Sequence, residues 1–302
     1  MRLQEEYATT GSVEFAELSE TMLSQRVVAY INSDVSVTRG GLLDIGATTS
    51  LSNVTRAVTA SIPVPVDPLT PAGAQTMYDL WMLDSNNSNI LDGSDMGTGS
   101  DYGGLMQHVG VACLDLRIYG ASNDGYEGIY HSIYDDYRYM SVFADPNGFI
   151  WHQTVAAVWG SIALRLADSD ILPISYVEYA AYLNKTMTTL QTLDVNRTYT
   201  EAFRSIYASM DALTRTAVQL DSYVVDAGVR ASLTDGSARA ALQLRMLNDQ
   251  LFLSERCLMY WQGIPGREWY RHVVWVGQSQ RSTHAERANA LACWSAAGVS
   301  FL

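Results

Sequence analysis

The first part of the chain alternates between helical and strand-like hydrophobic patterns. Apolar residues at helical spacing over 12–27 run into VVAYINSD at 27–34, a short β-branched run closed by polar turn formers. A second such run, HVGVACLDLRIYG at 108–120, precedes the polar loop ASNDGYEG, and a helical segment at 71–83 lies between the two runs. This alternation predicts an α/β fold with functional loops at the carboxyl ends of parallel strands.

The pattern becomes helical from about Trp151 onward. Long segments carry apolar residues at three- and four-residue spacing, which is typical of helices packed on one face, and the one strand signal is the short YRHVVW. These segments span 151–170, 171–190, 201–225 and 238–261. We therefore predict an α/β domain over residues 1–171 and an all-α domain over residues 172–302.

The composition of the chain excludes some classes of binding partner. The 302 residues carry a net charge of −13, which argues against nucleic acid as a partner and leaves cations and metal ions as ligands. The longest apolar-rich stretch, at 154–167, is interrupted by Arg165 and is too short to span a bilayer, so we expect no membrane span in this chain. N-x-S/T sequons are typical of secreted glycoproteins, although unused sequons are common; they occur at Asn53, Asn86, Asn184 and Asn196.

Carboxylates and a histidine stand where the predicted strands end. Asp34 closes the first strand, His131 lies in the loop after the second, and Glu5 and Glu6 precede the first helix. If the two strands are neighbours, these side chains can meet at one edge of the sheet. Carboxylate and imidazole groups suit zinc, and a further carboxylate can act as a base toward bound water. The alternatives are acidic residues at a helix N-terminus and a loop histidine with a structural partner.

Seven ordered segments give the chain a specific resemblance. The chain resembles the glutamate carboxypeptidase II and transferrin receptor family of M28 zinc peptidases over almost its whole length. The matching segments are EEYATTGSVEFAE, VVAYINSD, GTGSDYGGLMQHVGVA, YEGIYHSIYDDY, WHQTVAAVWGSIALRLADSDILP, RMLNDQLFLSER and GIPGREWYRHVVW. The resemblance implies part of an M28-type zinc-peptidase α/β domain followed by an all-α transferrin-receptor-like dimerisation domain.

The resemblance implies a role for each candidate residue. Glu5 matches the family's general base, and Tyr130 matches the tyrosine that helps to hold the tetrahedral intermediate. Glu6 and His131 match ligands of one zinc ion, and Asp34 matches a ligand of the other.

Two further groups of positions follow from the same resemblance. Glu14 and Glu17 match carboxylates of a structural calcium site, although acidic residues in the first turn of a helix explain them equally well. The substrate-binding positions of the family correspond to Gly99, Ser100, Arg117, Ser282 and Thr283. Several of these differ from the glutamate-selective pattern, and Asp115 stands where a pocket arginine is found. We therefore expect a neutral or basic residue, not an acidic one, beside the scissile bond.

The expected function follows from these positions. We expect a zinc-dependent exopeptidase in which a metal-activated water attacks a peptide substrate, and a homodimer formed through the helical domain. Only MRLQ precedes Glu5, whereas the family's remaining zinc ligands, a histidine and a bridging aspartate, come earlier in the chain. The chain is thus expected to be a carboxyl-terminal portion, inactive alone, of a protein of the secretory pathway, extracellular space or vacuole, or anchored to a membrane by an upstream segment. The alternative is a non-catalytic dimerisation or binding protein like the transferrin receptor.

Overall fold

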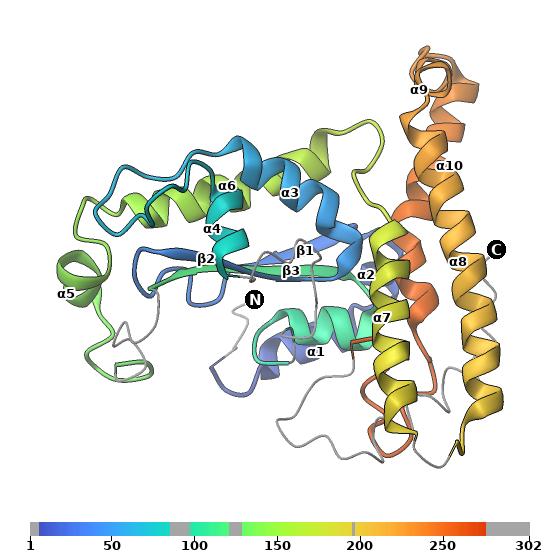
Figure 1. Ribbon diagram of the computed structural model, residues 1–302, viewed down its shortest axis with the longest axis horizontal. Coiled ribbons are helices and arrows are strands. Elements are labelled where there is room, and N and C mark those ends of the chain that lie inside the picture. The colour runs from blue at the N-terminus through green and yellow to red at the C-terminus, as the bar shows by residue number, and fades with distance from the viewer. Residues whose placement is uncertain (1–5, 85–95, 97, 121–128, 195–196, 276–302) are drawn as a thin grey trace.

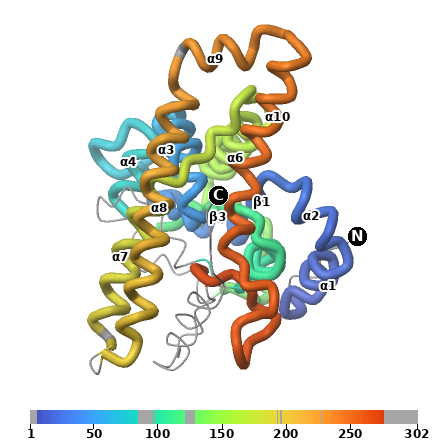
Figure 2. The backbone as a smooth tube through the Cα atoms, turned by 90° about the vertical axis from the view of Figure 1, so that its right-hand side faces the viewer, coloured from blue at the N-terminus to red at the C-terminus, as the bar shows by residue number. Residues whose placement is uncertain are grey.

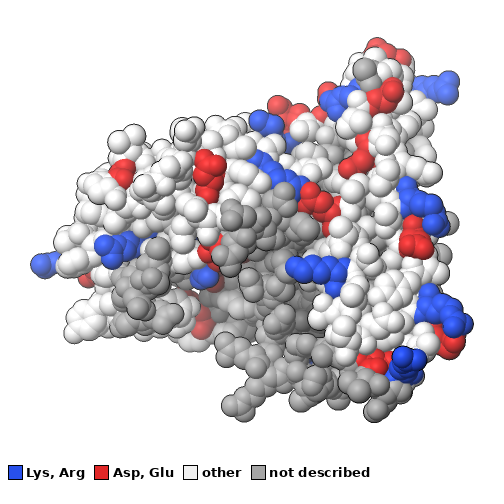
Figure 3. All heavy atoms as spheres, in the orientation of Figure 1, with Lys and Arg blue, Asp and Glu red and all other residues white. Residues whose placement is uncertain are grey.

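The computed structural model describes residues 6–84, 96, 98–120, 129–194 and 197–275. Figure 1 shows a small sheet with helices on both of its faces, and a column of long helices beside it. Acidic and basic side chains are interspersed over the face seen in Figure 3. None of the helices in the described ranges is both long and apolar enough to cross a membrane.

The sheet has three strands in the order β1-β3-β2. The strands are β1 (Ala29–Asn32), β2 (Leu42–Ala47) and β3 (Ala112–Tyr119). β1 and β3 pair in parallel, with Ala29 opposite Ala112, as the two β-branched runs predicted. β2 was not predicted; it pairs antiparallel with β3, and its buried and half-buried residues alternate. The parallel pair brings the ends of β1 and β3 to the same edge of the sheet.

Helices of the first half surround this sheet, with α3, α4 and α6 on one face and α1 on the other (Figure 1). Their bounds are α1 (Thr10–Leu18), α2 (Glu20–Arg26), η1 (Thr49–Leu51), α3 (Ser52–Ser61), α4 (Met77–Asp84), η3 (Gly104–Val109), α5 (Tyr137–Tyr139), η5 (Met140–Ala144) and α6 (Ile150–Asp168). The single helix predicted over 12–27 is two helices that separate at Ser19. η3 is a π-helix capped by Gly110, whose φ of 80° favours glycine.

Helices make up most of the second half as far as Leu258, and residues 259–275 form turns and isolated bridges. Its elements are α7 (Val177–Leu193), α8 (Thr200–Val225), α9 (Ala227–Leu233), α10 (Ala238–Leu253) and η6 (Ser254–Leu258). The apolar residues of α8 at helical spacing are buried, as predicted. The YRHVVW segment forms only an isolated bridge between Met259 and His272. The fold class is thus confirmed as α/β followed by all-α, whereas the boundary between residues 171 and 172 stays a prediction.

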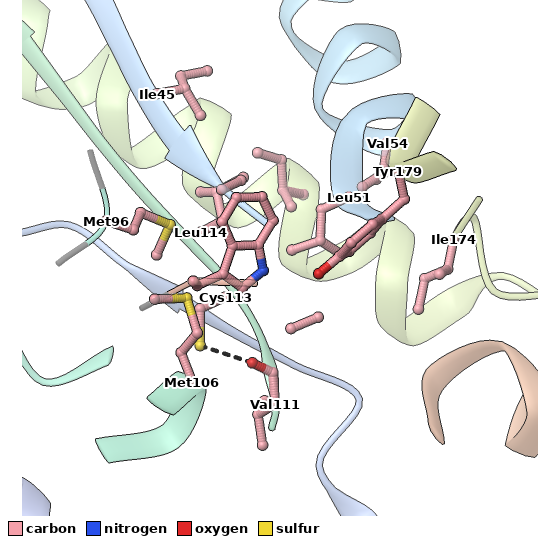
Figure 4. Close-up of a cluster of buried hydrophobic side chains, with 14 of the residues drawn as sticks. Ile45, Leu51, Val54, Met96, Met106, Val111, Cys113, Leu114, Ile174 and Tyr179 are labelled. Carbon is pink, nitrogen blue, oxygen red and sulfur yellow. Dashed lines mark hydrogen bonds between the residues drawn. The ribbon is translucent and has the colours of Figure 1, made fainter. Parts of the chain in front are cut away.

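One hydrophobic cluster extends through both halves. In Figure 4, Met106, Cys113 and Leu114 from the sheet side face Leu51 and Tyr179 from η1 and α7. The thiol of buried Cys113 donates to the carbonyl of Val111 at 3.2 Å, and burial raises the pKa of this thiol well above its usual value. The helical half therefore packs directly on the layer that carries the strands.

Candidate functional site

A cavity of about 690 Å³ opens between the residues before α1, the loop before η3 and the loop after β3. Five of the predicted site residues line it, and they are Glu6, Glu17, Gly99, Tyr130 and His131. These five residues come from three segments that are far apart in the sequence.

Glu6 and His131 pair with each other in the lining of this cavity. The Oε2 atom of Glu6 lies 3.0 Å from Nε2 of His131, and both side chains are more than half exposed. The ring of Tyr130 stacks on the imidazole of His131, with ring centroids 3.9 Å apart. A carboxylate oxygen and an imidazole nitrogen thus point at the same spot beside a phenol.

The backbone around the cavity is strained. Ala8, Thr9 and His131 have left-handed φ angles of 56°, 55° and 58°, and Val35, just after Asp34, has a φ of 51°. Ala8, Thr9 and His131 all line the cavity. Left-handed conformations cost residues with a Cβ about 1–3 kcal/mol each and cluster at functional sites, where surrounding structure holds them. This clustering favours a functional role for the cavity.

Asp34 lies in a polar cluster just after β1 and is not among the residues that line the cavity. Its backbone N–H donates to Oδ1 of Asp115 at 3.1 Å, and Nδ2 of Asn32 donates to the same oxygen at 3.1 Å. Burial, together with the charge of Asp34, raises the pKa of Asp115 to about 6. The structure thus brings Glu6 and His131 together but places Asp34 beside Asp115.

The two carboxylates predicted for calcium lie on α1, one turn apart. Oε1 of Glu17 accepts a hydrogen bond from the indole N–H of Trp269 at 2.7 Å, and Glu17 lines the cavity. Glu14 is exposed and does not line it. Glu17 therefore fixes α1 to the C-terminal part of the described chain.

The positions predicted for substrate binding are dispersed. Gly99 lines the cavity, whereas the buried hydroxyl of Ser100 accepts a hydrogen bond from Nδ2 of Asn32 at 2.9 Å. The guanidinium of Arg117 pairs with Asp44 across the β2–β3 ladder at 2.9 Å. Glu5, Ser282 and Thr283 lie outside the described residues.

Sequence reasoning missed the aromatic wall of the cavity. Trp269 and Tyr270 line the side near Glu17. His108 stacks on Trp269 at 5.1 Å between ring centroids, and Nδ1 of His108 lies 3.0 Å from the Trp269 carbonyl. The one signal available was the WY pair within GIPGREWYRHVVW, which has no periodic pattern. No Lys or Arg belongs to the lining formed by the described residues, which contains the carboxylates of Glu6 and Glu17 and the imidazole of His131.

Glu6 and His131 supply part of the set of ligands that a zinc ion needs. Glu6 and His131 offer one oxygen and one nitrogen at an exposed position, and both atom types are common zinc ligands. Catalytic zinc ions usually have three protein ligands. Within the described ranges, no group of three or more His, Cys, Asp or Glu side chains is arranged to hold a metal ion.

The chain is similar to several peptidases over most of its length. It is 33% identical to the probable glutamate carboxypeptidase LAMP1 of Arabidopsis thaliana over 271 residues, which cover 90% of this chain and 36% of that protein. It is 30% identical to the aminopeptidase NAALADL1 of Rattus norvegicus over 285 residues, again 90% of this chain and 36% of the relative. The chain thus spans about a third of the length of these curated relatives.

The helical half also matches a known domain family. Residues 201–291 match the transferrin receptor-like dimerisation domain. This range contains α9, α10 and all of α8 except Thr200. The peptidase relatives extend the match over nearly all of the chain. The chain therefore belongs to the glutamate carboxypeptidase and transferrin receptor-like family.

Proposed function

We propose that the gene product containing this chain is a zinc-dependent exopeptidase, with the cavity beside Glu6 and His131 as its active site. The observation that carries the proposal is the 3.0 Å approach of Glu6 to His131 beside the Tyr130 ring. The names of the relatives support the reaction class, because one is a probable glutamate carboxypeptidase and another an aminopeptidase.

Glu6 and His131 would hold one zinc ion, and Asp34 is the proposed ligand of a second. A bound zinc ion lowers the pKa of its water and so supplies a nucleophile at neutral pH. Glu14 and Glu17 remain proposed ligands of a structural calcium ion. Both metal assignments rest on the resemblance and on the donor types.

The chain's own residues would handle the proton and the developing charge. Glu5 would take a proton from the attacking water and return it to the leaving amine. The Tyr130 hydroxyl would donate a hydrogen bond to the carbonyl oxygen as that oxygen becomes negative. The strained backbone at His131 would hold the imidazole in place while this happens.

The proposed substrates are peptides with a neutral or basic residue beside the scissile bond. The described lining of the cavity contains no guanidinium or ammonium group to neutralise an acidic side chain. Arg117, one position expected to contact acidic substrates, is engaged by Asp44. We therefore do not propose that the enzyme prefers peptides with a terminal glutamate.

We further propose that the protein is a homodimer that passes through the secretory pathway. The match to a dimerisation domain over residues 201–291 supports the dimer. Among the sequons, Asn53 and Asn184 are exposed and so accessible to a glycan. The same match favours the alternative function, a non-catalytic protein that dimerises and binds a partner.

The phenol of Tyr130 gives the sharpest test of the reaction. Tyr130→Phe in the gene product should lower kcat on short peptides by about 100-fold with little change in KM, because the lost hydrogen bond forms only as charge develops. Tyr134→Phe, an exposed tyrosine of the same loop outside the cavity lining, is the matched control.

Chelation by 1,10-phenanthroline should abolish the hydrolysis, and added zinc should restore it. A zinc-supplied gene product that hydrolyses none of a panel of free dipeptides and N-acylated dipeptides would overturn the peptidase proposal in favour of the alternative. Equal rates for Tyr130→Phe and the wild type would remove Tyr130 from the mechanism.

A further inference from the structure

The aromatic wall of the cavity consists of two neighbouring residues, Trp269 and Tyr270, which share the cavity with Glu6 and His131. Their rings meet edge to face, with centroids 5.2 Å apart and 84° between the ring planes. Both residues are only half-buried. The reaction proposed above gives these rings no role, although they lie in the same cavity as its proposed metal ligands.

The indole of Trp269 is fixed in place by its neighbours. Its N–H donates to Oε1 of Glu17 on α1 at 2.7 Å, and Figure 2 shows the red end of the described chain next to α1. The imidazole of His108 stacks on the indole, with 25° between the ring planes, and Nδ1 of His108 lies 3.0 Å from the Trp269 carbonyl. Because the ring is immobilised in advance, little further side-chain entropy is lost when a ligand packs against it.

The ring of Tyr270 is also held by its neighbours. The guanidinium carbon of Arg267 lies 4.2 Å from the centroid of the ring. The backbone N–H of Tyr270 donates to the carbonyl of Arg267 at 2.9 Å, and the N–H of Ile264 donates to the carbonyl of Tyr270 at 2.9 Å. Arg267 itself is not among the residues that line the cavity. Both rings of the aromatic wall are therefore preorganised.

An apolar surface adjoins the aromatic wall. Val13 lies one helical turn before Glu17, so the two side chains share the face of α1 that Trp269 contacts. A Cβ at Gly104 would lie 3.6 Å from Cα of Val13, which places this part of η3 against the same helix. Val13 and Gly104 both line the cavity, and no Lys or Arg belongs to its described lining. A large apolar side chain therefore finds partners here, whereas a carboxylate finds no cation.

We infer that the aromatic wall receives a large apolar side chain of the peptide substrate, on a residue beside the scissile bond. The inference rests on the proposed function and narrows the neutral or basic residue named there to a large apolar one, such as phenylalanine or leucine. The cavity volume of about 690 Å³ lies within the range of about 300–1,000 Å³ that is usual for ligand sites. Aromatic rings favour such a ligand, because they bury a large apolar area and pack well against a further ring.

Rates of hydrolysis test this specificity. The substrates are Xaa-Ala and Ala-Xaa dipeptides, free and N-acetylated, with Phe, Leu, Ala, Arg or Glu as Xaa, and the readout is the ratio of kcat/KM between two of them. In one of these series the zinc-supplied gene product should favour Phe or Leu over Ala about tenfold or more, and Trp269→Ala should remove most of this preference. A loss of folded protein lowers both rates equally and leaves the ratio unchanged.

Two further variants make the test specific. Trp261→Ala removes an indole that is 46% exposed and lies outside the cavity lining, so it should keep the wild-type ratio. Tyr270→Ala removes the second ring of the aromatic wall and should lower the ratio. It decides the question if Trp269→Ala fails to fold.

A binding measurement gives a second readout that needs no reaction. In ligand-observed NMR titrations of the gene product, N-acetylphenylalanine amide should bind about tenfold or more tightly than N-acetylalanine amide, because the larger side chain buries more apolar area. Trp269→Ala should remove most of this difference, and Trp261→Ala should keep it.

The two proposals fail in different ways. A protein that hydrolyses none of the peptides but binds the phenylalanine probe through Trp269 would overturn the peptidase and keep the apolar subsite. An active wild type that favours neither Phe nor Leu in any series would leave the peptidase standing and overturn the subsite. The subsite would also be overturned by a Phe-to-Ala ratio that is equal in the wild type, Trp269→Ala and Tyr270→Ala, or that Trp261→Ala lowers as much as Trp269→Ala does.

Discussion

The buried carboxylate of Glu255 forms hydrogen bonds with side chains from both halves of the molecule. It is fully buried, and it accepts hydrogen bonds from Ser50 at 3.0 Å and Tyr179 at 2.9 Å. The indole N–H of Trp275 lies 3.3 Å from its Oε1 atom, and Nε2 of His272 lies 3.2 Å from the same oxygen. These partners come from η1, α7 and the C-terminal part of the described chain. A buried carboxylate is tolerated only when such partners satisfy it.

Replacing Glu255 should therefore be costly. Glu255→Ala leaves four buried polar groups without their acceptor and creates a cavity, so the free energy of unfolding should fall by about 3 kcal/mol or more. Urea unfolding measures the change, and Glu255→Gln, which keeps the shape and one acceptor oxygen, should cost less.

Glu201, exposed and paired with Arg204 on the surface of α8, provides the control. Glu201→Ala should change the free energy of unfolding by no more than about 0.5 kcal/mol. Equal effects of Glu201→Ala and Glu255→Ala would show that the buried network does not hold the halves together.

At the scale of elements, α6 is held at its N-terminus by close packing. Trp151 is fully buried at the start of the helix, and a Cβ at Gly40 would overlap its indole ring. Asp145 accepts backbone N–H bonds from Trp151 at 2.9 Å and His152 at 3.0 Å, which satisfies donors of the first turn. The loop before β2 and the start of α6 are thus in close contact.

Two glycine substitutions should consequently have opposite effects. Gly40→Ala forces its methyl group into the Trp151 ring and should lower the free energy of unfolding by about 2–3 kcal/mol. Gly160→Ala, inside α6 with open space around its Cβ position, should raise it by about 0.5–1 kcal/mol. Thermal unfolding followed by circular dichroism distinguishes them. A stabilising Gly40→Ala would mean that the two elements are not in contact as described.

The elements that sequence predicted best are those with strong local patterns. The β-branched runs gave β1 and β3, and three- and four-residue spacing gave α8 and α10. β2 was missed because LLDIGA carries Asp44 and Gly46, which weaken a strand signal that only pairing with β3 completes. The break at Ser19 was missed because the apolar spacing continues through it.

The candidate site was predictable only in part. The sequence places Glu6 before the first helix and His131 in the loop after the second strand, and both were expected at one edge of the sheet; the two residues are in contact. Asp34 was expected at the same edge of the sheet; its backbone N–H donates to Asp115, and it is not among the residues that line the cavity. Trp269 was missed because its contact with Glu17 spans 252 residues, and no local pattern encodes such a contact.

At the scale of the whole molecule, the C-terminal part of the described chain links the helical half to the cavity. Arg271 donates to Glu20 at 2.8 Å, and its backbone N–H donates to the carbonyl of Gln107 at 2.9 Å. Arg256, just after α10, reaches the carbonyls of Ser24 at 3.2 Å and Val27 at 2.6 Å. The helices next to the proposed active site are therefore held by the half that is proposed to form the dimer.

Glu6 and His131 are proposed to hold a metal ion in a peptidase, and the zinc content of the protein tests this proposal. The gene product is saturated with zinc, dialysed and analysed by elemental mass spectrometry as the wild type, His131→Ala and His152→Ala. His152 is the matched control, because its Nδ1 lies 2.9 Å from Asp145 in another histidine–carboxylate pair outside the cavity lining.

We expect His131→Ala to lose one zinc ion per subunit, since removing one of few ligands greatly weakens binding, and His152→Ala to keep the wild-type number. An unchanged zinc content in His131→Ala, or a wild-type protein that retains no zinc, would contradict it.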